Sequence, residues 1–320
     1  MEVKKLGKSL LKLLSKEDLD KIHYATAQVL EKTGAKFLHD EALDILEKNG
    51  AIVDRKTKIA KIPEAVFNEF RKKAPNEFPA FNRNGKRVQR LRDDFYIETF
   101  GEGTYMTDRD GTQRPSTLKD VEKIVLFGDA LENVDVAWVG CMPTDLHPNV
   151  QMIHAMEVLI NNSPTKPIQL EGENGDQMRY EIRMGAALLG GMEELRKTPI
   201  VVGGGWATSP LVHAKDILDS QLMAAKEGLP TLCGSMACAI TTAPATLAGT
   251  LVIWNAEVMS SLVLSQMIAP GVPFEIECSG SASDPRKGYY PVGNPEAALV
   301  NAGCMELSNY YDLPCLVAGC

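Results

Sequence analysis

The segment Pro199-Ile-Val-Val-Gly203 is a short apolar run that opens with proline and ends at glycine. Proline is tolerated at the first position of a strand, and glycine lets the chain turn sharply where a strand ends. A related apolar segment without proline begins near Val134. Four other segments repeat the pattern: Pro167-Ile-Gln-Leu170, Pro230-Thr-Leu-Cys233, Pro273-Phe-Glu-Ile276 and Pro314-Cys-Leu-Val317. The repeat predicts about six strands of one parallel sheet.

Helical stretches are expected between these strands, at residues 150–161, 177–189, 212–227, 247–268 and 295–311. Alternating strands and helices indicate a parallel α/β fold, either doubly wound or a barrel. A Gly-x-Gly-x-x-Gly fingerprint does not follow the first strand, which weakens the dinucleotide-binding form of the doubly wound fold. The even repeat favours a TIM (β/α)8-type barrel, incomplete at about six units. We expect this barrel domain to span residues 117–320.

Residues 1–116 do not follow this strand–helix repeat and are predicted to form an N-terminal accessory segment, largely helical. One helix should start at the capping box Ser15–Asp18 and end at Gly34. A second is expected from Asp40 to Lys48, and a third after Pro63. Asn84-Gly85 is a hairpin-type turn, and residues 95–97 are strand-like.

The overall composition is that of an ordinary globular protein, with 44% apolar and 24% charged residues. The net charge of −8 argues against nucleic-acid binding. We find no targeting segment and no apolar run long enough to predict a membrane span. Seven cysteines are scattered without metal-ligand spacing, which indicates free thiols, no metal site and a cytoplasmic location.

Several long stretches resemble the trimethylamine methyltransferase family over residues from about 14 to the end. The N-terminal matches are Leu14-Ser-Lys-Glu-Asp-Leu-Asp-Lys-Ile-His23, Gly34-Ala-Lys-Phe37 and Ala51-Ile-Val-Asp54. The others are Thr241-Thr-Ala-Pro-Ala-Thr-Leu-Ala-Gly249, Asn255-Ala-Glu-Val258, Gln266-Met-Ile-Ala-Pro-Gly271, Gly293-Asn-Pro-Glu-Ala-Ala-Leu-Val-Asn-Ala302 and Tyr310-Tyr-Asp-Leu-Pro314.

The resemblance implies a barrel that moves a methyl group from trimethylamine to the cobalt of a cognate corrinoid protein, as in methanogenesis from methylamines. The corrinoid would be carried by that partner, so no cofactor is expected on this chain. Family members that use trimethylamine carry pyrrolysine, encoded by an amber codon, at the end of the sixth strand. Pyrrolysine is therefore expected immediately after Cys320, and the 320-residue form is expected to be inactive. The full-length protein is expected to be a homo-oligomer, with no nucleic acid or membrane partner.

Two alternatives stay open from the sequence. Other members of the family lack pyrrolysine and act on glycine betaine or another quaternary amine. The chain could also be a non-catalytic barrel fragment that only binds a partner.

Barrel active sites lie where the strands end, so the residues around each terminal glycine are the candidates. A methylated amine is a cation, and cations are bound by carboxylates and aromatic faces. The expected substrate-binding residues are Glu171, Trp206, Asp145 and Ser279. The family mechanism suggests a carboxylic acid that protonates the pyrrolysine imine, and Glu277 or Glu173 is expected in this role.

Overall fold

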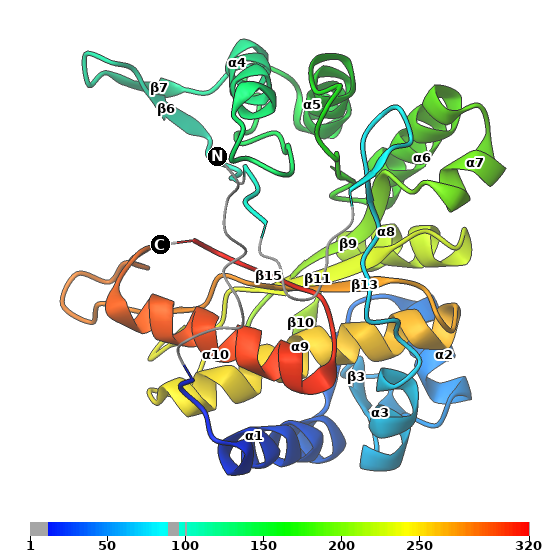
Figure 1. The fold of residues 1–320 in the computed structure, drawn as a ribbon. Coiled ribbons are helices and arrows are strands. Elements are labelled where there is room, and N and C mark those ends of the chain that lie inside the picture. Colours follow the sequence, from blue (N-terminus) through cyan, green and yellow to red (C-terminus); the bar gives the residue numbers. More distant parts are fainter. Residues whose placement is uncertain (1–11, 89–95, 100, 320) are drawn as a thin grey trace. The chain divides into compact units, whose positions relative to one another are not determined.

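A computed structural model describes residues 12–88, 96–99 and 101–319, and these divide into two compact units (Figure 1). The first unit comprises described residues from 79 to 203, and the second comprises residues 12–78 and 204–319. This division differs from the expected boundary near Ser116, which stays a prediction. Cys320 lies outside the described residues.

The first unit combines short strand pairs with four helices in its described part. Its helices are α4 (Leu118–Ala130), α5 (Pro148–Asn162), α6 (Gly175–Leu189) and α7 (Met192–Lys197). Two antiparallel pairs are formed by β4 (Ala80–Phe81) with β5 (Arg87–Val88) and by β6 (Tyr105–Thr107) with β7 (Gln113–Pro115). Strand β8 (Leu170–Glu171) pairs in parallel with the start of β9 (Val201–Ala207). The β4–β5 pair confirms the hairpin expected at Asn84-Gly85.

The second unit contains the longer parallel strands. The end of β9 is followed in this sheet by β11 (Thr231–Ser235), β13 (Phe274–Cys278) and β15 (Cys315–Val317). Helices α8 (Lys215–Lys226), α9 (Leu247–Ile268) and α10 (Pro295–Tyr311) connect these strands, and β12 (Cys238–Ala239) pairs with β14 (Ser281–Ala282). The parallel α/β pattern is as expected, but among the described residues the strands do not form a closed barrel. The barrel class therefore stays a prediction.

The N-terminal part of the second unit forms a helical layer with a small sheet of its own. It contains α1 (Lys16–Gln28), a π-helical turn (Val29–Thr33), α2 (Asp40–Lys48) and α3 (Glu64–Arg71). The small sheet has the order β10 (Val212–His213), β1 (Ala35–Phe37), β3 (Ile59–Lys61) and β2 (Ile52–Asp54). The predicted capping box is confirmed, since Ser15 and Asp18 exchange hydrogen bonds at the start of α1.

Helix α9 is the central element of the second unit. It contacts α1, α2, α3, α8 and α10 as well as β11 and β13. Its sequence is apolar on all sides, which is typical of a buried helix. The indole N–H of Trp254 donates to the carbonyl of Glu277 at 2.9 Å and so ties the helix to β13.

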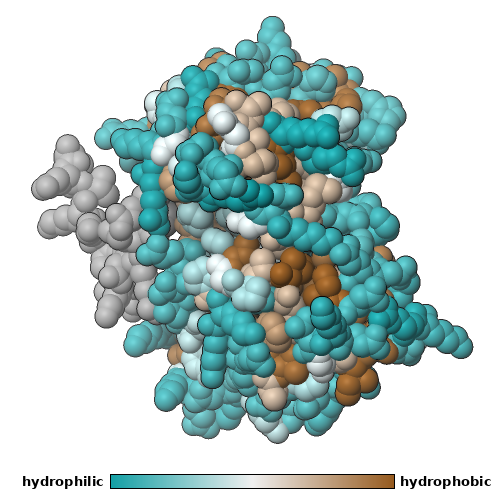
Figure 2. Space-filling model, turned by 90° about the vertical axis from the view of Figure 1, so that its right-hand side faces the viewer, coloured by the Kyte–Doolittle hydropathy of each residue, from teal (hydrophilic) through white to brown (hydrophobic). Residues whose placement is uncertain are grey.

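By length and composition α9 is also the one described helix that meets the criteria for crossing a membrane, but 72% of its apolar window is buried inside the fold. Burial of this kind is typical of a core helix. On the face shown in Figure 2, hydrophilic side chains cover most of the surface, and hydrophobic ones gather in small patches between them.

Three sequence predictions about secondary structure were wrong. The run from Val134 forms isolated bridges at residues 136, 137 and 141 and no regular strand. Tyr96 and Ile97 are not in a strand, and Phe95 lies outside the described residues. The helix expected from Val212 starts at Lys215, because Val212 and His213 pair with β1. Helix α4 was not predicted at all, although Asp120 accepts hydrogen bonds from Thr117 at its start.

Candidate functional site

The second unit brings three of the predicted residues to the ends of neighbouring parallel strands. Trp206 is near the end of β9, Glu277 is in β13, and Ser279 follows β13. The register places Gly234 opposite Glu277 and Glu277 opposite Leu316. The carboxyl ends of β9, β11, β13 and β15 therefore lie at one edge of the sheet, as the sequence pattern predicted.

Strand β13 has two chemically different faces. Phe274, Ile276 and Cys278 belong to the apolar core that includes residues of α9 and α10. Successive side chains of a strand point to opposite faces, so Glu275 and Glu277 point away from that helical layer. Both are buried, with exposed fractions of 1% and 2%. Carboxyl groups at such depth are rare unless they serve a partner or a reaction.

Glu275 was not among the predicted site residues. The signal was present, because Phe-Glu-Ile-Glu-Cys at residues 274–278 alternates apolar and acidic residues with the period of a strand. The proline-to-glycine pattern predicted site residues only around the glycine that ends each strand, and Glu275 lies before that point.

Trp206 lies against the same face of the sheet. A Cβ atom on Gly234 would be 2.5 Å from Cδ2 of the indole ring, which is closer than side-chain atoms approach one another. Glycine at 234 therefore makes room for the ring on β11, directly beside the position of Glu277 in the register. The result is an aromatic face and two carboxyl groups on one side of the parallel strands.

The opposite face of β11 is held to α9 by polar contacts. The carboxylate of Glu257 in α9 accepts hydrogen bonds from Ser235 Oγ at 2.5 Å, Ser209 Oγ at 2.8 Å and the backbone N–H of Leu211 at 2.7 Å. Burial raises the pKa of Glu257, and the three donors act in the opposite direction. This arrangement fixes the end of β11 and the turn after β9, and with them the setting of Trp206.

The loop after β13 supports Ser279. Its backbone N–H donates to the carbonyl of Ser235 at 3.2 Å, and its own carbonyl accepts from the hydroxyl of Tyr290. These contacts continue the β11–β13 pairing beyond the strands. Ser279 is half-buried at the same edge as Glu277.

In the first unit, Glu171 and Glu173 lie on either side of Gly172 between β8 and α6. Glu171 is half-buried, and Glu173 is exposed. A Cβ on Gly172 would be 2.6 Å from the backbone nitrogen of Met178, so glycine permits this close approach of the strand end to the helix. The N–H of Glu173 donates to Gln177 Oε1 at 3.1 Å.

Two more acids of the first unit, neither of them a predicted site residue, are affected by the charge of Glu173. The protein around Glu102 and the charge of Glu173 raise the pKa of Glu102. Burial, followed by the charge of Glu173, raises the pKa of Glu181 to about 8. Glu102 and Glu173 are exposed, and water screens charges there, whereas Glu181 is fully buried. Glu181 therefore carries the larger perturbation of the three.

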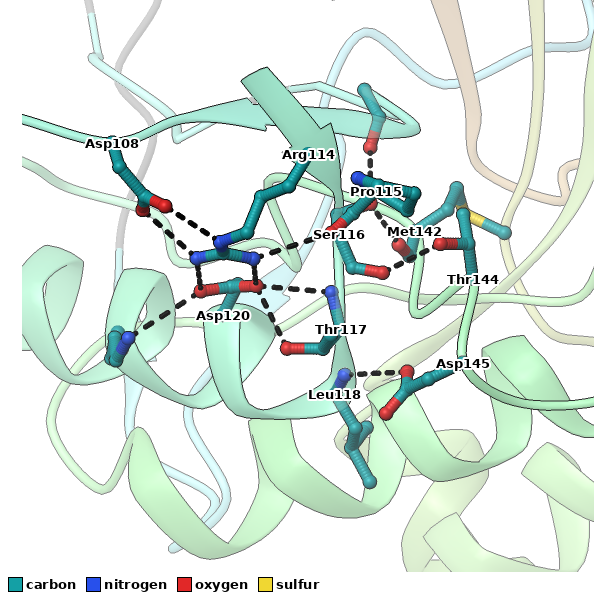
Figure 3. Close-up of polar contacts among 12 residues, drawn as sticks. Asp108, Arg114, Pro115, Ser116, Thr117, Leu118, Asp120, Met142, Thr144 and Asp145 are labelled. Atoms are coloured by element: carbon teal, nitrogen blue, oxygen red, sulfur yellow. Dashed lines mark hydrogen bonds and ion pairs between the residues drawn. The ribbon is translucent and has the colours of Figure 1, made fainter. Parts of the chain in front are cut away.

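Asp145 has a structural contact (Figure 3). Its carboxylate accepts the backbone N–H of Leu118 at 2.9 Å, at the first turn of α4, where backbone donors lack partners within the helix. Its predicted substrate contact stays a prediction. Next to it, Arg114 forms a two-pronged ion pair with Asp120, which holds the pKa of that carboxyl well below its usual range.

The predicted site residues thus fall into two groups. Trp206, Glu277 and Ser279 share one strand edge of the second unit, while Asp145, Glu171 and Glu173 belong to the first unit. Their expected roles stay predictions. The described cysteines are free thiols, as expected, with Cys278 and Cys304 in contact at 3.0 Å between sulfur atoms.

Comparison with known proteins shows a match over nearly the whole chain. A family model described as trimethylamine methyltransferase (MTTB) matches residues 3–320. Trimethylamine methyltransferase MttB of Desulfitobacterium hafniense is 36% identical over 317 residues, which are 95% of this chain and 62% of the relative. MttB of Methanosarcina thermophila is 34% identical over 316 residues, covering 97% and 65%.

A relative with a different substrate in its name also matches. The glycine betaine methyltransferase of Desulfitobacterium hafniense Y51 is 29% identical over 305 residues, covering 94% of this chain and 63% of that protein. The chain spans less than two thirds of the length of each of these three relatives.

Proposed function

Because the chain belongs to the trimethylamine methyltransferase family, we propose that it takes part in methyl transfer from a methylated amine to the cobalt of a separate corrinoid protein. The observation that carries this proposal concerns the face of the parallel strands that points away from α9 and α10. On this face Trp206 lies beside the position of Glu277, and Glu275 points the same way. An aromatic face next to carboxyl groups suits a methylated ammonium cation.

In this proposal the residues of the chain bind and orient the amine. The indole face of Trp206 contacts the methyl groups, and the carboxyl group of Glu275 offsets the positive charge. Methyl transfer requires the methyl carbon to lie in line between the nitrogen that it leaves and the cobalt that accepts it. Holding the amine in that position is therefore the main contribution of the protein. Glu277, buried near the strand end, is the group proposed to hold a proton there.

Trimethylamine is the favoured substrate, since relatives with that name are 36% and 34% identical to the chain. The second candidate is glycine betaine or another quaternary amine, supported by the 29% identical relative. The codon that follows Cys320 separates them. An amber codon with further in-frame sequence favours trimethylamine and pyrrolysine, while a different codon favours the quaternary amine.

The activity is tested with the full-length product of the gene, a purified corrinoid partner in its reduced form, and trimethylamine or glycine betaine. Methylation of the corrinoid changes its visible absorption, which gives the rate. We expect Glu277→Gln to lower the rate about 100-fold or more, in the range for loss of a group that handles a proton. Trp206→Phe keeps an aromatic face and should mainly raise KM.

The matched control for Glu277→Gln is Glu157→Gln, which removes an exposed carboxylate of α5 that pairs with His154. A full rate in Glu277→Gln would show that the site lies elsewhere. Absence of methylation with both amines, in a correctly folded wild-type protein, would contradict the proposed function itself. The 320-residue form, expected to be inactive, is compared in the same assay.

A further inference from the structure

Two buried cysteines of the second unit, Cys278 at the end of β13 and Cys304 in the middle of α10, have their sulfur atoms in contact. The two Sγ atoms are 3.0 Å apart, and the exposed fractions of the residues are 1% and 0%. Cys233, equally buried on the neighbouring strand β11, instead donates to the backbone carbonyl of Gly234 at 3.6 Å. Cys278 and Cys304 therefore form a thiol pair, whereas Cys233 is a single core thiol.

Packing brings the two thiols together from separate segments. They are 26 residues apart in the chain, and α10 packs against β13. Both belong to the apolar core of the second unit, on the face of β13 opposite to Glu277. A bond between them would close the loop that contains Ser279 and Tyr290.

The surroundings of the two sulfur atoms differ. The backbone N–H of Gly280 donates to Cys278 Sγ at 3.3 Å, and such a donor supports negative charge on the sulfur. A Cβ on residue 280 would be 2.5 Å from Cγ1 of Val300, so glycine permits this turn beside α10. Burial, followed by the contact with Cys278, raises the pKa of Cys304. Cys278 is therefore the more reactive nucleophile of the pair, and Cys304 is the thiol that keeps its proton.

A disulfide between these residues needs little rearrangement. Bonded sulfur atoms are about 2.0 Å apart, so the two Sγ atoms have to approach by about 1 Å. Cys315 is a further thiol near β13, since the register places it opposite Ile276 on the neighbouring strand β15. Its Sγ donates to the carbonyl of Leu316 at 3.7 Å. The contact between sulfur atoms thus favours the link between Cys278 and Cys304.

We propose that Cys278 and Cys304 are an oxidative modification site, at which a peroxide forms a disulfide that a dithiol reductant reverses. The thiolate of Cys278 attacks one oxygen of hydrogen peroxide, the O–O bond breaks, and hydroxide leaves a sulfenic acid behind. The sulfur of Cys304 then attacks the sulfenic sulfur, the S–O bond breaks, and the departing hydroxide takes up the proton of Cys304. Two thiols and one peroxide give one disulfide and two waters, so two electrons pass from sulfur to peroxide.

The disulfide would act on the candidate site, and this part of the inference rests on the proposed function. Cys278 lies between Glu277 and Ser279, so a bond to α10 draws the end of β13 toward the helical layer. Glu277 then moves away from its setting beside Trp206. Because small displacements of a positioning group are costly, we expect methyl transfer to fall about tenfold in the linked protein and to recover on reduction.

The test uses the full-length product of the gene, reduced and then treated with hydrogen peroxide. Free thiols are alkylated, and peptides are mapped by mass spectrometry without reduction. We expect a peptide containing Cys278 linked to one containing Cys304, with the loss of two hydrogens, and its disappearance with dithiothreitol. Urea below the unfolding transition should speed the linkage, since peroxide reaches buried sulfur atoms through local opening.

Variants identify the two partners. Cys304→Ala should abolish the linked peptide and the reversible loss of methyl transfer. The matched control is Cys233→Ala, which removes an equally buried thiol of the same core and should leave the linkage as in the wild type. If Cys304→Ala fails to fold, Cys304→Val, of larger volume, replaces it.

Three outcomes overturn the inference: peroxide leaves both thiols free, it oxidises Cys278 without linking it to Cys304, or it links either of them to Cys315. A fully linked protein that transfers methyl groups at the reduced rate overturns the effect on the candidate site. The linkage is read by mass, independently of activity. Absence of methyl transfer in the reduced protein therefore contradicts the proposed function and leaves the modification site standing.

Discussion

Glu257 of α9 and Glu181 of α6 are both fully buried glutamates, and their surroundings are opposite. Glu257 receives three hydrogen bonds from two serine hydroxyls and a backbone N–H. Glu181 receives none from the described residues. A carboxylate with fixed donors is held in place and in turn holds the segments that donate to it, whereas one without donors responds to changes in pH and to nearby charge.

The largest effect should come from breaking the network around Glu257. In Glu257→Ala, the donors at Ser209, Leu211 and Ser235 lose their acceptor inside the fold. We expect the free energy of unfolding to fall by about 3 kcal/mol or more. Urea unfolding followed by circular dichroism measures it, with Glu31→Ala at an exposed position as the control. A loss no greater than that of the control would show that the three hydrogen bonds do not hold the turn.

Asp120, in the first unit, also accepts several hydrogen bonds. Replacing it tests whether hydrogen bonds to a carboxylate stabilise this unit as well. Asp120→Asn weakens the pairing with Arg114 and should cost about 2 kcal/mol at neutral pH. Because the pKa of Asp120 is lowered in the fold, mainly by Arg114, its contribution is present above the unfolded value and is lost as the solution is acidified below about pH 4.

The wild type and Asp120→Asn should therefore converge in stability at low pH. Glu122→Gln, an exposed position on the same helix, is the matched control and should show no such convergence. A stability difference independent of pH would mean that Asp120 acts through shape rather than charge.

The smallest effect is expected at Glu181 and has the opposite pH dependence. The pKa of Glu181 is raised to about 8, so the fold prefers the protonated form. The stability that this form contributes is complete below the unfolded value and is lost as pH rises toward 8. Glu181→Gln, which cannot ionise, should equal or fall slightly below the wild type at pH 5 and be more stable than the wild type at pH 8.

Thermal unfolding across this pH range measures the difference. Parallel curves for the two proteins would show that Glu181 does not change its charge between pH 5 and pH 8, and the contrast with Glu257 would then have no functional meaning.

Much of the secondary structure could be predicted because its signals are local. Helices α9 and α10 have the predicted bounds, since Thr246 and Asn294 cap their first turns. The strand predicted at Val134 failed because its apolar residues engage in isolated bridges with separate segments. The helix predicted from Val212 failed at its start because strand pairing with β1 competes for those residues.

The candidate site was predicted only in part. Terminal glycines led to Trp206, Glu277 and Glu173, but not to Glu275, Glu257 or Glu181. Sequence position alone does not distinguish a glutamate on the solvent side of a helix from one on the buried side when the helix has weak amphipathicity. Helix α9, apolar on all sides, gave no such distinction for Glu257.

By itself the sequence determined the family, through long matching stretches, and the alternation of strands and helices from Pro167 onward with the strand ends at which a cation site is expected, through local patterns of apolar residues, proline and glycine. Only the tertiary structure decided that Gly234 makes room for the ring of Trp206, that three donors converge on Glu257 and that no donor in the described part of the chain reaches Glu181. The reason is physical: burial and hydrogen-bond partners depend on which distant segments pack together, and these set the charge state of a carboxyl group.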